Sequence, residues 1–440
     1  MTIRRLLITF IAFLSLYMHT NCPAFADAAP QIYYERGVKL AVPESGTEFK
    51  LRTEIASYYL YTSVNQRGGD YSSGRNAFAI QRANLIAAGN FEEKRFSYFI
   101  KHNFADSESN NHSGVSEDFN IFTGMAADSV LGPNYPTSTE NRFLEAWLQW
   151  NSPDNTAKIR VGRQKVPFGL QLAMQETELQ FINTSLFVQA VQTNFDPSDS
   201  KARTLRLSDR QDGVTGHSFV TAGDNWGVGY TTGIFKQSID GTSYELDNSG
   251  GGTDVMLVLG IDFIGGGYDR SFEGDKYYSD AFAWTIGVGG TFSRVRMPTA
   301  YRYYPIIPVS SPSEVVYVWN GNVNAGIKYH GFSLQSEFFI NYTTPRGNGA
   351  DNCNVGYYAQ AGYFLVPKDH ELAFRFSGLA LDKDFGSRRE SFEYSVIYNY
   401  YLAGDFLKFQ TGVSYYDLKI PQVGERYVII RFISGFSGVF

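Results

Sequence analysis

Apolar and polar residues alternate along most of the chain from Thr47 onward, in segments of about 9 to 16 residues. In residues 315–329 the odd positions are almost all apolar, whereas Asn320, Asn322 and Asn324 occupy even positions. A period of two is typical of a β-strand with one apolar face and one polar face. The pattern therefore predicts an all-β structure over residues 47–440.

The length of these segments indicates strands that cross a membrane. Strands in soluble proteins average about five or six residues, whereas residues 315–329, at roughly 3.4 Å per residue, can cross a bilayer even when tilted by about 45°. Ladders with the same alternation occupy residues 282–292, 332–342 and 391–400, and turn signals such as Gly331 separate them. One face of each strand suits lipid and the other suits water, as in a transmembrane barrel.

The number of such segments is about 16 or 17, and a single-chain antiparallel barrel usually closes with an even number of strands. We therefore predict a transmembrane antiparallel β-barrel of 16 strands, with 18 strands as the alternative. The stretch Met174–Ser200 is the ambiguous part of the count. A soluble sandwich or propeller is the other architecture considered, but no short motif repeats at a fixed period.

The N-terminus has the features of a bacterial export signal. Arg4 and Arg5 precede an apolar run over residues 6–18, and the A-x-A pattern at residues 24–26 is a cleavage site. The predicted organisation is a signal peptide over residues 1–26, an N-terminal periplasmic segment over residues 27–46 and a barrel domain over residues 47–440.

Aromatic residues make up 16% of the chain, with 35 Phe, 30 Tyr and 5 Trp. Tyrosine favours the headgroup level of a membrane, so clusters at strand ends predict aromatic girdles. Two of these clusters are Tyr58, Tyr59 and Tyr61, and Tyr398, Tyr400 and Tyr401. The terminal Phe440 is similar to the end of bacterial outer-membrane barrels. The net charge of −6 argues against a nucleic-acid partner.

No pattern in the sequence indicates an enzyme or a cofactor. The histidines lack metal-ligand spacing, and Cys353 is the one cysteine left after removal of the signal. Asp369 and His370 are the adjacent pair that would suit a hydrolase at the rim of the barrel, but a solvated turn is the simpler interpretation. The glycines at 265–267 are interpreted as a flexible loop tip. We predict no catalytic residue, no metal site and no cofactor.

The water-facing positions of the first half of the barrel carry mostly basic side chains, accompanied by Glu54 and Glu145. Arg and Lys along a pore favour anions and exclude cations. The alternative is that these residues keep the lumen wet and pair with carboxylates. The predicted pore-lining basic residues are Lys50, Arg52, Arg82, Lys101, Lys158, Arg160, Arg206 and Arg210.

Four segments carry a resemblance to a known family, at residues 48–53, 78–89, 161–169 and 210–214. Their sequences and order resemble the phosphate-selective porin O and P family. The resemblance implies a homotrimeric outer-membrane porin of 16 strands, whose third loop folds into the lumen as a constriction over residues 175–200. The constriction-loop residues implied are Gln175, Glu176, Glu178, Asn183, Gln189, Asp196, Asp199 and Lys201. Unlike that of phosphate-selective members, this loop is acidic and has no lysine before Lys201.

The sequence thus predicts a bacterial outer-membrane porin for passive diffusion of small hydrophilic solutes. A weak preference for anions is expected, with phosphate or other inorganic anions as candidates. The alternatives are a pore for neutral solutes such as sugars and, further off, a rim hydrolase or an adhesive, structural barrel. The expected partners are outer-membrane lipid and lipopolysaccharide, small solutes or anions and two further copies of the chain.

Overall fold

The fold was analysed in a computed structural model. It describes residues 31–34, 37–42, 45–67, 72–104, 143–188, 210–236, 255–296, 315–345, 351–381, 389–405, 407–420 and 425–440. No helix within these ranges combines the length and the apolar character needed to cross a membrane. The signal peptide predicted for residues 1–26 lies outside the described residues.

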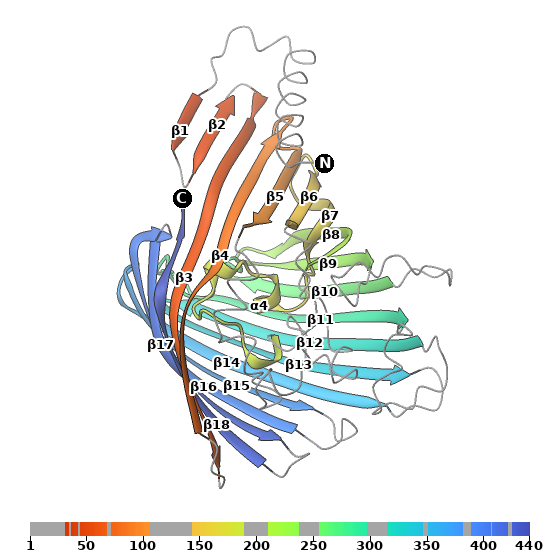
Figure 1. Ribbon diagram of the computed structural model, residues 1–440. Coiled ribbons are helices and arrows are strands. Elements are labelled where there is room, and N and C mark those ends of the chain that lie inside the picture. The colour runs from red at the N-terminus through yellow and green to blue at the C-terminus, as the bar shows by residue number, and fades with distance from the viewer. Residues whose placement is uncertain are drawn as a thin grey trace.

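The described strands form one antiparallel sheet that closes into a barrel (Figure 1). Sixteen strands make the closed wall, as the alternation predicts. They are β3 (Thr47–Arg67), β4 (Ser72–Phe91), β5 (Phe96–Asn103), β6 (Phe143–Asn151), β7 (Ala157–Lys165), β8 (Arg210–Gly223), β9 (Trp226–Lys236), β10 (Val255–Gly265), β11 (Ala283–Arg296), β12 (Val315–Tyr329), β13 (Phe332–Pro345), β14 (Asn352–Val366), β15 (His370–Leu381), β16 (Arg389–Asp405), β17 (Leu407–Ile420) and β18 (Glu425–Val439).

The barrel closes where the last strand pairs with the first strand of the wall. β18 pairs with β3 from Arg426 opposite Arg67 to Val439 opposite Glu54. The terminal residue continues this register, because the amide nitrogen of Phe440 donates to the carbonyl oxygen of Thr53 at 2.8 Å. Closure therefore leaves no unpaired edge along β18. A sheet in lipid requires this, because its backbone groups cannot bond to water there.

Two short strands before the wall lengthen the sheet at one end. β1 (Gln31–Tyr34) and β2 (Val38–Val42) form a hairpin, and β2 pairs with residues 47–51 of β3, beyond the end of β18. The segment predicted to precede the barrel, residues 27–46, therefore contains a hairpin that covers the projecting part of β3.

The faces of the wall follow the predicted alternation. In β12, Trp319 and Val323 are each 52% exposed on the outside, whereas Asn320 and Asn322 are 5% and 4% exposed on the inside. Apolar side chains such as Leu259 and Phe374 likewise face outward from other strands. This outer surface suits contact with lipid.

One part of the girdle prediction is wrong. Tyr59 and Tyr61 face outward, each 42% exposed, but Tyr58 and Tyr401 are only 1% and 2% exposed inside the barrel. Neighbouring side chains on a strand point to opposite faces, so a run of tyrosines cannot all lie on the membrane side. Part of the aromatic excess therefore belongs to the interior.

The connections differ between the two ends of the barrel. At one end they are mostly short turns, such as 224–225, 330–331 and 367–369. At the other end the connections are longer, and one of them begins with residues 166–188. The connection 266–282 is an exception, because it is long although it lies at the end with the short turns.

Candidate functional site

Residues 166–188, which we name the constriction segment, follow β7 and lie inside the barrel (Figure 1). The segment contains the short helix α4 (Leu170–Ala173) and the 3-10 turn η3 (Glu176–Glu178). It is the described part of the connection that the resemblance places in the lumen. Any solute that crosses the barrel must pass it.

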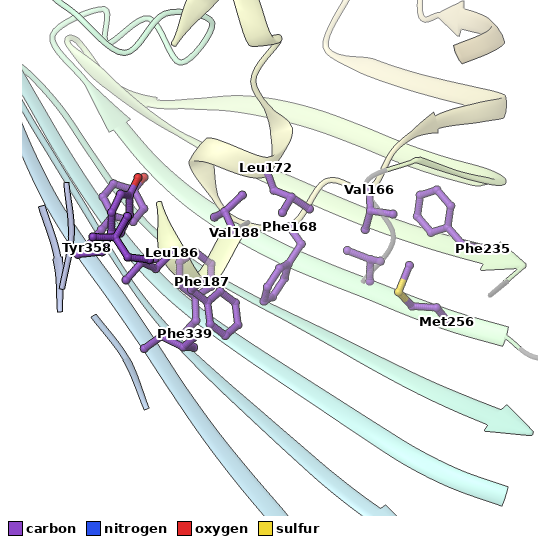
Figure 2. Close-up of a cluster of buried hydrophobic side chains, with 14 of the residues drawn as sticks. Val166, Phe168, Leu172, Leu186, Phe187, Val188, Phe235, Met256, Phe339 and Tyr358 are labelled. Carbon is purple, nitrogen blue, oxygen red and sulfur yellow. The ribbon is translucent and has the colours of Figure 1, made fainter. Parts of the chain in front are cut away.

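An apolar cluster holds one side of the constriction segment against the wall (Figure 2). The ring of Phe187 stacks on Phe339 of β13 with 4.4 Å between the ring centroids. Burial of such side chains stabilises by about 1.5 to 3 kcal/mol each. The segment contributes Val166, Phe168, Leu172, Leu186, Phe187 and Val188, and the wall contributes Phe235, Met256, Val258, Phe339, Tyr358 and Leu379 among others.

Glycines in the wall make room for this packing. A Cβ atom at Gly356 would lie 2.2 Å from Cδ2 of Phe187, and one at Gly362 would lie 2.0 Å from Nε2 of Gln180. Neither position could carry a side chain with these neighbours in place. The wall is thus shaped for this segment.

Replacing Gly356 with Ala should therefore destabilise the barrel by about 1 to 3 kcal/mol, because Phe187 must leave its site. Thermal unfolding in detergent, followed by circular dichroism, measures the change. Gly260→Ala is the matched control, since a Cβ atom there would have no neighbour closer than 3.8 Å. Equal effects of the two substitutions would contradict the packing argument.

A buried carboxylate, Glu337 of β13, binds the start of α4. Its oxygens accept hydrogen bonds from the amide nitrogens of Leu170 and Gln171, both at 2.8 Å. They also accept from Nδ2 of Asn322 at 3.0 Å and from the hydroxyl of Tyr358 at 2.5 Å. The first amides of a helix lack partners within the helix, so Glu337 supplies them.

The motif before α4 permits this contact. Gly169 has a φ of 74°, and a Cβ atom there would lie 2.5 Å from Oε2 of Glu337. A residue with a side chain would be strained in this conformation and would also block the carboxylate. This explains why a glycine ends residues 161–169, one of the four segments that resemble the porin family.

Gln180 anchors the far part of the constriction segment. Its Nε2 donates to Glu371 at 2.5 Å, and its carbonyl oxygen accepts from Asn399 at 3.0 Å and from Gln410 at 3.1 Å. In the same region Lys408 donates to the carbonyl oxygen of Leu179 at 2.8 Å. Side chains from β16 and β17 therefore hold the backbone of the segment, and Glu371 of β15 holds the side chain of Gln180.

Glu176 of η3 lies among three cations from the wall. Its carboxylate is 2.5 Å from Nη2 of Arg210, 3.1 Å from Nζ of Lys101 and 3.3 Å from Nζ of Lys165. Burial opposes ionisation of this carboxyl, but Arg210, Lys165 and Lys101 hold its pKa well below the usual range. Glu176 is therefore an anion at neutral pH.

Two wall carboxylates extend this charge cluster. Glu54 lies 2.9 Å from Nζ of Lys101 and 3.5 Å from Nε of Arg82, and Glu145 lies 3.3 Å from Nε of Arg210. We name the seven residues the charge cluster; they are Glu54, Arg82, Lys101, Glu145, Lys165, Glu176 and Arg210. Three of the predicted pore-lining cations are thus engaged by carboxylates.

Other predicted cations are more open to the lumen. Arg52, Lys158 and Arg160 are half-buried on the inner face of β3 and β7. The guanidinium of Arg160 lies 4.0 Å from the ring centroid of Trp147 and donates to Oε1 of Gln149 at 2.8 Å.

The last two predicted cations are Lys50 and Arg206. Lys50 is half-buried at the rim, in the part of β3 that pairs with β2. Arg206 falls outside the described residues. The structure thus divides the described members of the predicted basic set into those that belong to the charge cluster and those that lie half-buried outside it.

The predicted constriction residues fall into two groups. Gln175, Glu176, Glu178 and Asn183 lie in the constriction segment, where the carbonyl oxygen of Asn183 accepts from Nη1 of Arg375 at 2.7 Å. Gln189, Asp196, Asp199 and Lys201 lie outside the described residues.

Sequence reasoning missed Lys165, Gln180, Glu273 and Glu337. Lys165 lies within residues 161–169, one of the segments that carry the family resemblance, and could have been included among the predicted pore-lining basic residues. Gln180 lies within the predicted constriction range 175–200, and the alternation in residues 332–342 places Glu337 on the water-facing side, but neither pattern indicates the contacts made across the lumen. Glu273 gave no signal.

His370 is part of an aromatic group at the rim. Its ring stacks on Tyr400 with 4.5 Å between centroids, and its Nδ1 lies 2.5 Å from the hydroxyl of Tyr398. These contacts suit a girdle at the membrane surface. Within the described residues no group of three or more His, Cys, Asp or Glu side chains is placed to hold a metal ion.

The family model of the phosphate-selective porins O and P matches residues 59–291, which is more than half of the chain. The chain belongs to the phosphate-selective porin O and P family. It is a channel protein of the bacterial outer membrane. No curated protein matches the sequence.

Solved structures of other proteins have the same fold. The high-pH structure of Pseudomonas putida OprB gives a TM-score of 0.53 at 10% identity, covering 90% of this chain and 95% of that chain. An anion-selective porin from Comamonas acidovorans gives 0.52 at 11% identity, covering 90% and 100%. OmpT of Vibrio cholerae gives 0.51 at 10% identity, covering 93% and 100%. At such identities these structures support the architecture alone.

Proposed function

We propose that this porin is a passive channel for small hydrophilic solutes with a weak preference for anions, including phosphate and other inorganic anions. The observation that carries the proposal is the position of Arg52, Lys158 and Arg160, half-buried on the inner face of the wall. Nearby, the carboxylates of Glu54 and Glu145 are almost fully buried beside cations. Arg52, Lys158 and Arg160 are thus more open than these two wall carboxylates, although Glu176 and Glu178 of the constriction segment are also half-buried.

The charge cluster explains why the preference is expected to be weak. It holds four cations and three carboxylates, so most of its positive charge is neutralised within the protein. A phosphate ion would have to compete with Glu176 for Lys101, Lys165 and Arg210. A charge in a narrow pore still biases the ions that pass, because the field there is poorly screened.

Reversal potentials in a salt gradient test this proposal. The double variant Arg52→Glu with Arg160→Glu should shift the selectivity of purified protein in planar bilayers toward cations. Lys94→Glu is the control, because Lys94 lies on an exposed turn at the rim. Cation selectivity of the wild-type protein, or an unchanged reversal potential in the double variant, would contradict the anion preference.

A pore for neutral solutes such as sugars is the second candidate. Trp147 offers an aromatic surface inside the barrel, which favours this function, but Arg160 already covers it. The inward asparagines bond to one another, as Asn341 does with Asn320 at 2.7 Å. The test is the swelling of protein-containing liposomes. Faster swelling in oligosaccharide solutions than in solutions of ion-sized solutes would favour this candidate.

We further propose that the mature protein begins after residue 26 and that residues 27–46 and the short turns face the periplasm, as is usual in such barrels. Lipid and lipopolysaccharide would surround the outer face, and three copies would form a homotrimer without catalytic activity. Cross-linking of native outer membranes followed by gel electrophoresis tests the trimer. A monomeric pattern would contradict it.

A further inference from the structure

The connection 266–282, which we name the inner turn, is folded into the protein rather than exposed. It begins with Gly266 and Gly267, whose φ values of 62° and 72° turn the chain sharply. Neighbouring connections at this end, such as 224–225, are tight turns between strands. The buried residues of the inner turn are Tyr268, Phe272, Glu273, Asp275 and Lys276.

The wall anchors the inner turn through specific contacts. Nζ of Lys328 donates to the carbonyl oxygens of Asp269 at 2.6 Å and Phe272 at 2.5 Å. The carboxylate of Asp275 accepts from the amide nitrogen of Gly331 at 2.7 Å. A buried amine that binds backbone carbonyls fixes the path of the chain, so the inner turn has a defined conformation.

Glu273 joins the inner turn to the constriction segment. Its Oε1 accepts from Nε2 of Gln171 at 2.9 Å, and its Oε2 accepts from the amide nitrogen of Gln180 at 2.6 Å. Its own amide nitrogen donates to the carbonyl oxygen of Glu178 at 3.2 Å. One side chain from the short-turn end thus binds both α4 and the residue that anchors the far part of the constriction segment.

The apolar side of the inner turn lies at the end of the lumen that carries the short turns. Phe272 forms a buried cluster with Phe364 and Tyr401 from the wall. A small cavity at the junction is lined by Phe272 of the inner turn, by Thr177 and Glu178 of the constriction segment and by Lys408 of the wall. The two inserted segments therefore meet inside the barrel.

We propose that the inner turn is a second constriction element, which enters from the end opposite to the constriction segment, positions that segment through Glu273 and narrows the exit of the channel. The inference rests on the proposed channel function. In this arrangement the width of the pore depends on two inserted segments, each contacting a different part of the wall and both contacting each other. Glu273 is a positioning residue rather than a contact for the solute.

The substitution Glu273→Ala tests the proposal in planar bilayers. The loss of the hydrogen bonds to Gln171 and Gln180 should raise single-channel conductance by about twofold and increase the noise of the open-channel current. Glu273→Gln should give an intermediate value, because its one side-chain oxygen can replace only part of the carboxylate. Resistance of the barrel to unfolding by heat in SDS should fall as well, because the buried amide nitrogen of Gln180 loses its partner, so the rise in conductance is the result that decides.

A second variant loosens the inner turn from the other side. Lys328→Met removes the two hydrogen bonds from this side chain to the backbone of the inner turn and leaves the constriction segment unchanged. It should also raise conductance. Asp224→Ala, on an exposed turn at the same end, is the control and should conduct like the wild type.

The outcomes separate this inference from the proposed function. Suppose that the wild-type protein conducts and that Glu273→Ala and Lys328→Met show the same conductance and the same current noise as the wild type. In that case the inner turn is not a constriction element. A loss of SDS resistance with unchanged conductance would also overturn the inference, because it would indicate a purely structural role. A wild-type protein without any channel activity would instead overturn the proposed function.

Discussion

Glu176→Gln is expected to raise the anion selectivity of the channel at neutral pH on the order of threefold. The carboxylate of Glu176 lies within 3.3 Å of Arg210, Lys101 and Lys165, and it is the acid of the charge cluster that belongs to the constriction segment. The amide keeps the size of the side chain but removes the charge. Glu54 and Glu145 remain, so the cluster becomes more positive where the lumen is narrowed.

The measurement is the reversal potential in a potassium chloride gradient. Glu178→Gln is the matched control, because Glu178 lies on the same turn but does not belong to the charge cluster. A shift of equal size in both variants would indicate a general effect of acidic loop residues. An unchanged potential in Glu176→Gln would show that ions do not pass near the cluster.

The pH dependence of the wild-type protein gives an independent check. Neighbouring cations hold the pKa of Glu176 well below its ordinary value of 4.5. Its contribution to stability is therefore fully present above that value and is lost only as the pH falls through the lower pKa of the folded state. The difference in anion selectivity between the wild-type protein and Glu176→Gln should therefore be constant from neutral pH to about 4.5 and should shrink in stronger acid, where Glu176 loses its charge.

The wall of the barrel could be predicted from the sequence because its signal is local. The side chains of a strand alternate between two faces, and an environment of lipid on one side and water or protein on the other imprints this period on the sequence. The first strand of the wall begins at Thr47, as the alternation indicates. The prediction for Tyr58 and Tyr401 is wrong, because tyrosines that are adjacent in the sequence point to opposite faces of the strand.

The interior could not be predicted in the same way, because its contacts join residues far apart in the chain. Lys101 and Glu176 are 75 positions apart, and Gln171 and Glu337 are 166 positions apart. Such pairs depend on barrel closure and on the path of the inserted segments, which no periodicity encodes. The glycines at 265–267 suggested a flexible tip, whereas Gly266 and Gly267 begin a buried segment.

Glu337→Ala is expected to have the largest effect on the constriction itself. The carboxylate accepts hydrogen bonds from the amides of Leu170 and Gln171 and from the side chains of Asn322 and Tyr358. Without it, two amides at the start of α4 lose their partners in a buried site. Each unsatisfied buried group costs about 1 to 3 kcal/mol, so the free energy of unfolding should fall by about 2 to 5 kcal/mol.

The same substitution should widen the channel, because the backbone amides of α4 then lose the carboxylate that anchors them to the wall. Conductance of single channels should rise, and the temperature at which the barrel unfolds in SDS should fall. Glu337→Gln offers a graded comparison, since its oxygen can serve the amides of α4 only if its NH2 group turns toward Asn322 or Tyr358. We expect an intermediate conductance for that variant.

Asn341→Ala separates an effect on the constriction from an effect on the wall. Asn341 lies on the same strand, is fully buried and bonds to Asn320 and Asn354 rather than to the constriction segment. Its loss should lower stability and leave conductance unchanged, because the wall asparagines do not hold α4. If Glu337→Ala and Asn341→Ala lower stability alike and neither changes conductance, then α4 stays in place without Glu337, and the apolar cluster around Phe187 and Phe339 alone fixes the constriction.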